Sequence, residues 1–474
     1  MRTTFHLKTL AVAIATLSVA SVTNAAGLDR SGQDVTAFFQ DGTYAEAVYT
    51  YIDADVSGYD SSNVNPGQND YERGDKTGDI AESYDFFRYG VKTDINDTFS
   101  IGLLYDEPFG AAAEYTQSNF VSQGDVDASI ASITNGAAPS LAAAQGAIGA
   151  LAAGETAGVL TPEQQAQLDG LRGAVAVAQA EAGNAGENTN VEVRSQSLTG
   201  ILGMKFGANK NFQIYGGPVA QRIQSETKLR GLAYGPATGY TSNSNPDMDY
   251  GYIAGIAYSK PEIALKAALT YRSEIDHDIE ISESYPLVAI RAIAAGATPE
   301  QAAAAANRDS TYEITTPKSV NFDFQTGINP TTLATAKVRW VPWSDFVITP
   351  PLYNDTSKIS YGPDGLNLVE YDDDQWQVEL GLAKRVAPAL AISGTVGWDS
   401  GAGDPTTSLG PVDGYYSVGL GAKYNVTENW AVSAGGKYLW FGDAKGRLPS
   451  GKIVGDFQDN DGYIAGLKIS YQGK

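Results

Sequence analysis

The sequence predicts an all-β protein, an antiparallel up-and-down transmembrane barrel of fourteen strands. Three observations predict this fold. An export signal begins the chain, about fourteen short segments alternate apolar and polar residues, and the connections between them switch between short and long. Tight turns at one end and long loops at the other are typical of bacterial outer-membrane barrels. We therefore expect an outer-membrane protein with both termini in the periplasm.

Residues 1–25 have the layout of a cleavable signal peptide. Arg2 and Lys8 supply positive charge, an apolar run follows over Leu10–Val22, and small residues end at Ala25. The apolar run is too short, and too rich in Ala, Ser and Thr, to anchor the chain in a bilayer, which needs ~20 apolar residues.

The mature chain divides into a short N-terminal segment, 26–45, and a barrel, 46–474. Two of its long connections are insertions, at 107–190 and 282–311. The short connections are clusters of turn-forming residues, at 95–97, 208–211, 259–262, 328–330, 386–388 and 426–428.

The composition agrees with a barrel. The chain has 52 Gly, 27 Tyr and 6 Trp, which suits a wall with aromatic girdles at its two rims. Removing the two basic signal residues from the 32 leaves 30 against 55 acidic residues, a charge of −25, which argues against nucleic-acid partners. The absence of cysteine is compatible with an exported protein that does not depend on disulfides.

Individual segments separate into two faces. In 415–424, Tyr416, Val418 and Leu420 share one face, and Tyr415 and Ser417 lie on the other. The last segment, 463–472, alternates in the same way and carries an aromatic residue at each end. A secreted β-sandwich would also alternate, but it rarely combines aromatic strand ends with a tight turn at every second connection.

Two long loops are predicted to contain helices, over 137–183 and 284–306. Each is rich in alanine and contains the start signal Thr-Pro-Glu-Gln, at Thr161 and at Thr298. Threonine can cap the helix, proline fits its first position, and glutamine can complete a capping box. These loops form either a helical lid over the barrel mouth or a solvated low-complexity insertion.

Five stretches in register resemble the FadL/TodX family of outer-membrane transporters of long-chain fatty acids and other hydrophobic compounds. The most distinctive is Tyr271-Arg272-Ser273-Glu274 in one strand, and Trp340 with Trp343-Ser344 marks another. The full set of similar stretches is 47–56, 100–115, 268–275, 337–346 and 375–442.

The resemblance implies passive uptake of a hydrophobic molecule, which is captured by the surface loops, binds in the lumen and leaves sideways through the wall at the third strand. The candidates for that exit are Gly102, Pro108, Phe109 and Gly110, although Gly102 could serve only to relieve crowding. Family members begin with a longer hatch that bears an Asn-Pro-Ala motif. Here a shorter segment stands in its place, with Phe38, Phe39 and Gly42 as a possible plug.

Ligand-contacting residues are expected on inward faces. The alternation puts Arg272, Lys337 and Arg339 in the lumen, where they could bind an acid group or pair with other charges. Arg222, in a strand bent by Pro218, is a further candidate and lies near the family's ligand-contacting arginine in the resemblance. Three apolar residues are also expected inside, namely Leu104, Leu439 and Phe441.

Catalysis, metal binding and cofactors are not expected. His277, the one histidine outside the signal, is expected to be exposed at the barrel rim, and a lone histidine does not make a hydrolase site. The acidic runs 372–374 and 456–461 fail the calcium-loop pattern and are expected to be solvated.

The sequence therefore predicts a monomeric channel whose partners are hydrophobic small molecules, fatty acids or hydrocarbons, together with outer-membrane lipid and lipopolysaccharide. The alternative is a general porin or a surface structural or adhesion barrel. A porin would have opposing rows of charged residues that face the lumen. This chain is expected to have few inward-facing charged residues per strand. The residues do not identify the ligand.

Overall fold

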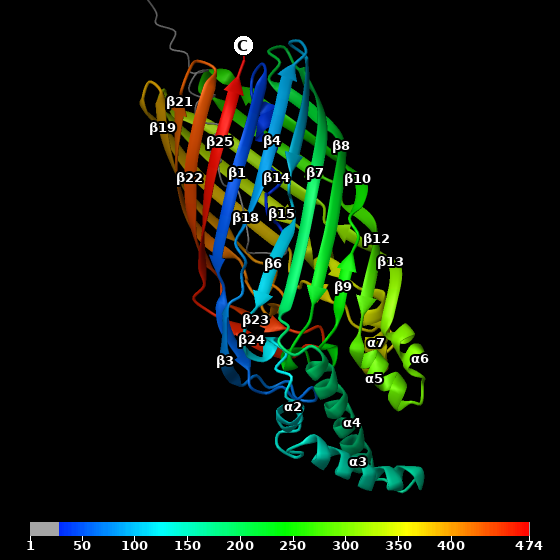
Figure 1. Ribbon diagram of the computed structural model, residues 1–474. Helices are drawn as coiled ribbons and strands as arrows, with labels where there is room; N and C mark the ends of the chain where they lie inside the picture. Colours follow the sequence, from blue (N-terminus) through cyan, green and yellow to red (C-terminus); the bar gives the residue numbers. More distant parts are fainter. Residues whose placement is uncertain (1–27, 474) are drawn as a thin grey trace, which may run out of the picture.

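A computed structural model describes residues 28–473 and shows a closed barrel of fourteen antiparallel wall strands, three of which are interrupted (Figure 1). The signal peptide predicted over 1–25 lies outside the described residues. In chain order the wall consists of β1 (Tyr44–Asp55), β4 (Tyr84–Asp94), β5 (Phe99–Asp106) with β6 (Gly110–Tyr115), β7 (Thr189–Phe206), β8 (Phe212–Lys228), β10 (Asp247–Lys260), β11 (Leu265–Arg272) with β12 (Ile275–Ser284), β13 (Asn307–Thr316) with β14 (Ser319–Asn329), β15 (Thr332–Val341), β18 (Gln375–Ala387), β19 (Leu390–Asp399), β21 (Tyr415–Asn425), β22 (Trp430–Phe441) and β25 (Asp461–Gln472).

The barrel closes between its first and last strands. β1 pairs with β25 along its whole length, from Tyr44 opposite Gln472 to Asp55 opposite Asp461, and its other edge pairs with β4. The tight turns gather at one end of the barrel, together with the C-terminus, and the long loops gather at the other (Figure 1). The predicted fold class is confirmed.

The outer face is apolar because side chains alternate along each strand. In β21, Tyr416, Val418 and Leu420 are 66%, 46% and 77% exposed, whereas Tyr415 and Ser417 are buried inside. β25 shows the same alternation, with Tyr463 and Leu467 outside. This alternation is the one that an outer-membrane barrel needs, lipid on one face and a filled lumen on the other.

The two alanine-rich loops are helical, as predicted. The first contains α2 (Val126–Ile133), α3 (Leu141–Thr156) and α4 (Pro162–Gly183), and the second contains α5 (Pro286–Ala294) and α6 (Pro299–Ala306). Both predicted capping boxes form, from Thr161 to Gln164 and from Thr298 to Gln301. No helix among residues 28–473 is long and apolar enough to cross a membrane.

A further helix and a small sheet were not anticipated. α7 (Pro351–Tyr361) begins with proline, but it lacks the alanine content that marked the other loops. Short strands from three connections form a five-stranded sheet at the loop end of the barrel. Its strands are β20 (Thr406–Thr407), β23 (Ala444–Arg447), β24 (Ile453–Phe457), β2 (Ser57–Ser61) and β3 (Arg73–Asp79).

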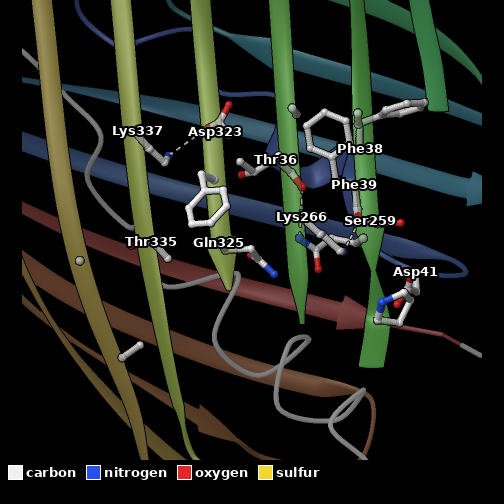
Figure 2. A pocket seen from close by; sticks show the side chains of 18 of the residues that line it. Thr36, Phe38, Phe39, Asp41, Ser259, Lys266, Asp323, Gln325, Thr335 and Lys337 are labelled. Carbon is white, nitrogen blue, oxygen red and sulfur yellow. Dashed lines mark hydrogen bonds and ion pairs between the residues drawn. The ribbon is translucent and has the colours of Figure 1, made fainter. Parts of the chain in front are cut away.

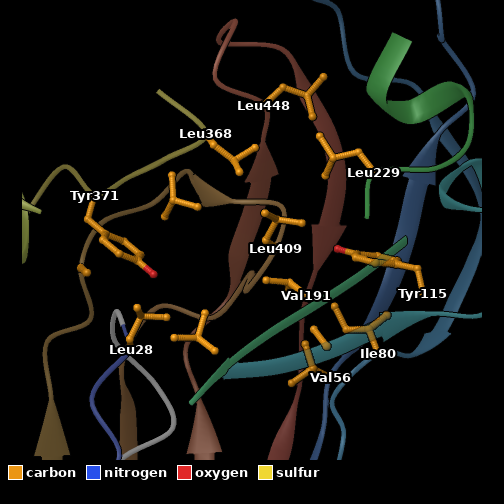
Figure 3. Packing of buried hydrophobic residues seen from close by; sticks show 14 of the residues in the cluster. Leu28, Val56, Ile80, Tyr115, Val191, Leu229, Leu368, Tyr371, Leu409 and Leu448 are labelled. Atoms are coloured by element: carbon orange, nitrogen blue, oxygen red, sulfur yellow. The ribbon is translucent and has the colours of Figure 1, made fainter. Parts of the chain in front are cut away.

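The main apolar core lies inside the loop half of the barrel (Figure 3). It extends from Leu28 of the N-terminal segment through Val191 of the wall to Leu229, Leu409 and Leu448 of the loops. The remaining short elements are η1 (Thr36–Phe39), η2 (Ser118–Phe120), η3 (Leu232–Ala237), β9 (Thr241–Ser244), η4 (Pro261–Ile263), η5 (Trp343–Asp345), β16 (Val347–Ile348) and β17 (Val369–Glu370).

Candidate functional site

Residues 28–43 lie inside the barrel and are here called the plug. Phe38 in η1 is only 1% exposed, and its ring contacts those of Phe39 and Tyr215, with centroids 6.0 and 5.8 Å away. Gly42 has a φ of 64°, a conformation that glycine adopts without strain. The segment expected to replace the family's hatch is therefore inside the lumen, and its role in gating stays a prediction.

Two plug aspartates form three ion pairs with the wall. Asp29 accepts from Nε of Arg339 at 2.5 Å and from its Nη2 at 3.2 Å. Asp34 accepts from Nζ of Lys337 at 2.8 Å and also lies 3.7 Å from Nη1 of Arg88. Because a buried charge is costly unless it is paired, these contacts hold the plug in one position.

Two of the expected lumen cations pair with other charges, which is one of the two alternatives that the sequence left open. Lys337 and Arg339 face inward, and their partners are plug carboxylates. Arg272 also faces inward and donates to Oγ1 of Thr199 at 3.1 Å. Whether any of them touches a ligand stays a prediction.

The inward placement expected for Arg222 is wrong. The alternation of β8 runs through Pro218 without a change of phase, so Tyr215, Val219 and Gln221 are buried and Arg222 is exposed on the outer face. A proline can bend a strand without changing which residues point inward. Pro218 does not change the alternation, so Arg222 points outward.

The three apolar candidates do face inward. Leu104 packs with Phe38 in a small cluster around the plug. Leu439 and Phe441 belong to the main apolar core of the loop half. The lumen is therefore apolar on the loop side of the plug, as an apolar ligand requires.

Gly102 is not where the third strand is interrupted. It pairs with Lys92 of β4 on one side and with Ile201 of β7 on the other. A Cβ atom on Gly102 would lie 2.7 Å from Cδ2 of Phe38, so the glycine leaves room for the plug.

The interruption falls at residues 107–109, between β5 and β6. β4 and β5 stop pairing at Tyr89 opposite Tyr105, and the next bridge on that side joins Ala81 to Ala113. Residues 84–88 of β4, within the described chain, have no strand partner on this edge. The wall thus has an opening in its hydrogen bonding next to Pro108 and Phe109.

The plug closes this opening from inside. Arg30 N–H donates to the carbonyl of Pro108, and Gly110 N–H donates to the carbonyl of Leu28, both at 2.8 Å. The guanidinium of Arg30 stacks 3.6 Å from the ring centre of Tyr84, across the opening. A Cβ atom on Gly110 would lie 2.2 Å from Cζ of Arg30, so glycine is needed for this contact.

Two narrow cavities lie on the loop side of the plug. The first, of about 90 Å³, lies among the loops and is lined by Tyr285, Tyr353 and Leu448 together with Arg291 and Lys452. The second, of about 50 Å³, lies deeper and reaches Leu28 of the plug and Ala111 of β6. The two cavities share Leu368, Thr407 and Leu409. They form a line from the loops to the opening in the third strand.

A third cavity, of about 690 Å³, lies on the other side of the plug, at the end with the tight turns. Phe38 and Phe39 border it, and charged side chains line much of its wall, including Lys266, Lys337 and Asp323 (Figure 2). It has no lining residue in common with the loop-side cavities. The plug lies between the two loop-side cavities and this larger cavity, which has more charged side chains in its lining.

A sequence model of the family described as "Outer membrane protein transport protein (OMPP1/FadL/TodX)" matches residues 19–472. The chain belongs to this family. It is an outer-membrane channel for hydrophobic compounds and not an enzyme. The predicted family and location are thereby confirmed.

Solved structures of FadL/TodX proteins share the fold. The chain is similar to a FadL homologue of Pseudomonas aeruginosa, with a TM-score of 0.59 and 15% identity over 95% of this chain and 98% of that one. It is also similar to the toluene transporter TodX of Pseudomonas putida, with a TM-score of 0.51 and 11% identity over 92% of each chain. No curated protein matches the sequence.

In this FadL/TodX channel, the expectation of an exposed His277 is wrong. The residue is completely buried, and its Nε2 and Nδ1 lie 3.1 Å from Gln221 and 3.3 Å from Asp247. Arg272, Ile275 and His277 are all buried, so the break at 273–274 shifts the alternation by one residue. Sequence periodicity carries no mark of that shift.

Both acidic runs expected to be solvated are engaged by neighbouring donors, and in the second run Asp461 accepts from the hydroxyl of Tyr438 at 2.6 Å. The first run makes more such contacts. Asp374 accepts from the indole N–H of Trp340 at 3.1 Å and from the hydroxyl of Ser344 at 2.5 Å. Asp372 pairs with Arg447 at 2.8 Å. These aspartates link loop segments to one another.

Proposed function

We propose that this channel takes up long-chain fatty acids or neutral hydrocarbons by loop capture, binding in the lumen and lateral release at the third strand. The observation that carries the proposal is the alignment of the two loop-side cavities with the opening at 107–109. Passage straight down would take an apolar molecule into the charged cavity beyond the plug. Lateral release instead keeps it in contact with apolar surface, which is worth ~25 cal/mol per Å² buried.

Movement is part of this proposal. An apolar cavity of ~150 Å³ is enough to hold benzene, and the cavities of about 90 and 50 Å³ are smaller than that. The loops therefore have to separate to admit a ligand. At the far end, Arg30 and the backbone of Leu28 have to leave the wall before the ligand can pass Gly110.

The loop helices are the capture surface in this proposal. α2, α3 and α4 pack on one another through Ile130, Ala144 and Leu171, with Ile148 and Leu151 half-buried at the edge of the cluster. Val159, between α3 and α4, is exposed. The loops thus present apolar side chains to an arriving molecule at the outer end of the barrel.

A carboxylate ligand would find cations at the loop-side cavity. Arg291 and Lys452 both line it, and Nζ of Lys452 donates to the carbonyl of Asn65 at 2.6 Å. Burial lowers the pKa of Lys452 to about 8, so the side chain is charged at neutral pH. This pair of cations favours fatty acids among the hydrophobic compounds that the family transports.

Binding to lipopolysaccharide and action as a monomer belong to the same proposal. The closed barrel of a single chain needs no partner to complete its wall, which supports a monomer. The acidic loop rim around Asp456 and Asp459 offers carboxylates for cation-bridged contact with lipopolysaccharide.

A reversible disulfide tests lateral release. Asp29 and Phe109 are antiparallel bridge partners, and the flanking hydrogen bonds make them a non-hydrogen-bonded pair, whose Cα atoms usually lie ~4.5 Å apart. That distance suits a disulfide, and the chain contains no other cysteine. In the Asp29→Cys/Phe109→Cys variant, oxidation should lower uptake of labelled oleate into cells at least about tenfold by fixing the plug in the opening.

Reduction of the same protein should restore the rate of the single-cysteine variants, which serve as controls for the lost ion pair and the lost ring. Equal uptake in the oxidised and reduced states would exclude release at this opening.

A further inference from the structure

The barrel wall contains a second place where neighbouring strands do not pair, between β10 and β12. On one side the last backbone bond runs from Ser273 N–H to Tyr252 O at 3.0 Å, and on the other from Asn245 N–H to Glu280 O at 2.9 Å. Between these bonds, residues 246–251 and 274–279 of the described chain share no strand pairing. Side chains have to join the strands here.

Three side chains meet across this seam. Nδ1 of His277, on β12, lies 3.3 Å from Oδ2 of Asp247, on β10. The carboxylate of Asp249 lies close to that of Asp247 and to the backbone N–H of Asp278. One nitrogen of the histidine and one oxygen from each aspartate all lie within 4.8 Å of one another.

The hydrogen bonds around His277 direct its lone pair toward the aspartates. Nε2 lies 3.1 Å from Oε1 of Gln221, an oxygen that also accepts from the hydroxyl of Thr316 at 2.8 Å. Nε2 therefore carries a proton, and in the neutral form of the ring Nδ1 presents a lone pair to the carboxylate of Asp247. Three acceptors thus face one another, and they need protons or a cation between them.

No protein cation supplies that charge. Among residues 28–473, no lysine or arginine forms an ion pair with Asp247 or Asp249. Asp276 and Asp278, exposed on the outer face of β12, add negative charge nearby. The side chain of Asp247 is 27% exposed, so an ion could reach the cluster from solvent.

We propose that His277, Asp247 and Asp249 bind a divalent transition-metal ion, with zinc as the reference case, which joins β10 to β12 across the seam. With metal–ligand bonds of ~2.0–2.1 Å, the ligands of a tetrahedral zinc ion lie ~3.3–3.4 Å apart, the present separation of Nδ1 and Oδ2. A metal-bound histidine usually donates its other N–H to an oxygen, as His277 does to Gln221. Water would complete the fourth position.

This site is separate from the proposed transport route. None of the three residues lines any of the three cavities described above. A bound metal ion would link β10 to β12 where no backbone hydrogen bonds join them. The proposal does not depend on what the channel transports.

Titration of the purified full chain in detergent with Co²⁺ or Zn²⁺ tests the proposal. We expect one Co²⁺ to bind per chain with visible absorption of a four-coordinate ion, and Zn²⁺ to displace it. His277→Gln and Asp249→Asn should each weaken binding at least about tenfold. Asp276→Asn removes the same charge from the outer face of β12 and should bind as the wild type does.

Two further readouts separate a lost site from a lost fold. All variants should keep the heat-modifiable migration of a folded barrel. In the wild type, Zn²⁺ should slow hydrogen exchange across residues 246–251 and 274–279. Absence of saturable binding in the wild type, or binding that His277→Gln leaves unchanged, would show that protons alone hold the cluster and would overturn the proposal.

Discussion

Asp29 of the plug and Arg339 of β15 form a two-point ion pair at 2.5 and 3.2 Å, buried in the middle of the barrel. Arg339 also donates to Asn321 and to Gln33, so one wall side chain fixes two plug residues. The aspartate lies directly opposite Phe109 at the third-strand opening. The pair therefore connects the far wall of the barrel to the place where we propose that the ligand leaves.

Replacing Asp29 by Asn should loosen the plug. Arg339 would remain buried without its carboxylate partner, and breaking a buried pair in this way typically costs about 3–5 kcal/mol. Ion conductance of the purified channel in planar bilayers should rise, because the plug separates the two halves of the lumen. Glu192→Gln, which breaks the exposed pair with Arg194, is the control. Conductance that matches the wild type would show that the ion pair does not hold the plug.

Replacing Gly102 by Ala should displace Phe38, because the new Cβ would lie 2.7 Å from its ring. We expect a loss of stability of roughly 1–3 kcal/mol, measured by thermal unfolding. A much larger Gly102→Trp substitution should stop transport through the same clash. Gly200→Ala, whose Cβ would meet Pro218 at an ordinary 3.9 Å, is the control.

The pairing of Gly102 with Phe38 can be separated from a general effect on the wall. In a Gly102→Ala/Phe38→Ala variant, the two losses should be less than additive, since the second change removes the ring that the first one strikes. Additive losses of stability would show that Gly102→Ala disturbs the barrel wall and not its contact with Phe38 of the plug.

Fatty-acid binding should depend on the charge of Lys452. Because its pKa is about 8, the side chain loses its proton as the pH rises from 7 to 9, and a carboxylate ligand loses a charge-assisted bond worth ~1.5–3 kcal/mol. Oleate affinity should fall over this range, whereas toluene affinity should stay constant. Lys452→Met should give weak oleate binding at every pH. Oleate affinity that is independent of both pH and this substitution would remove Lys452 from the binding site.

Removing α3 should slow uptake without unfolding the barrel. Within α3, only Ala144 is fully buried, so deletion of residues 140–160 exposes little of the core. We expect heat-modifiable migration to persist and the initial rate of oleate uptake to fall several-fold, because capture surface is lost. A chain with Ile148→Gln and Leu151→Gln keeps the helix and tests its apolar side chains alone. Wild-type uptake in both variants would assign the helix no part in capture.

Local patterns were sufficient for much of the fold. The faces of β21 and β25 follow from alternation, since a strand between lipid and a filled lumen has only two environments for its side chains. The helix starts at Thr161 and Thr298 follow from capping chemistry within four residues. The predicted inward positions of Lys337 and Arg339 are correct for the same reason of alternation.

Errors arose where the pattern depends on an interruption. The break at 273–274 shifts the phase of the strand and buries His277, while Pro218 in β8 leaves the phase unchanged and Arg222 on the outside. An interruption changes the inward and outward faces only if it adds an unpaired residue to the strand. Pairing with the neighbouring strands, which are distant in sequence, determines whether it does.

By itself, the sequence determined a fourteen-stranded barrel with tight turns at one end, helical loops at the other and an apolar outer face, because these features depend on residues close together in the chain. Only the tertiary structure decided what the inward side chains do. Asp29 meets Arg339 across 310 residues, and Asp247 meets His277 across an unpaired seam. Such contacts depend on barrel closure, which brings together buried charges that must find partners wherever the chain supplies them.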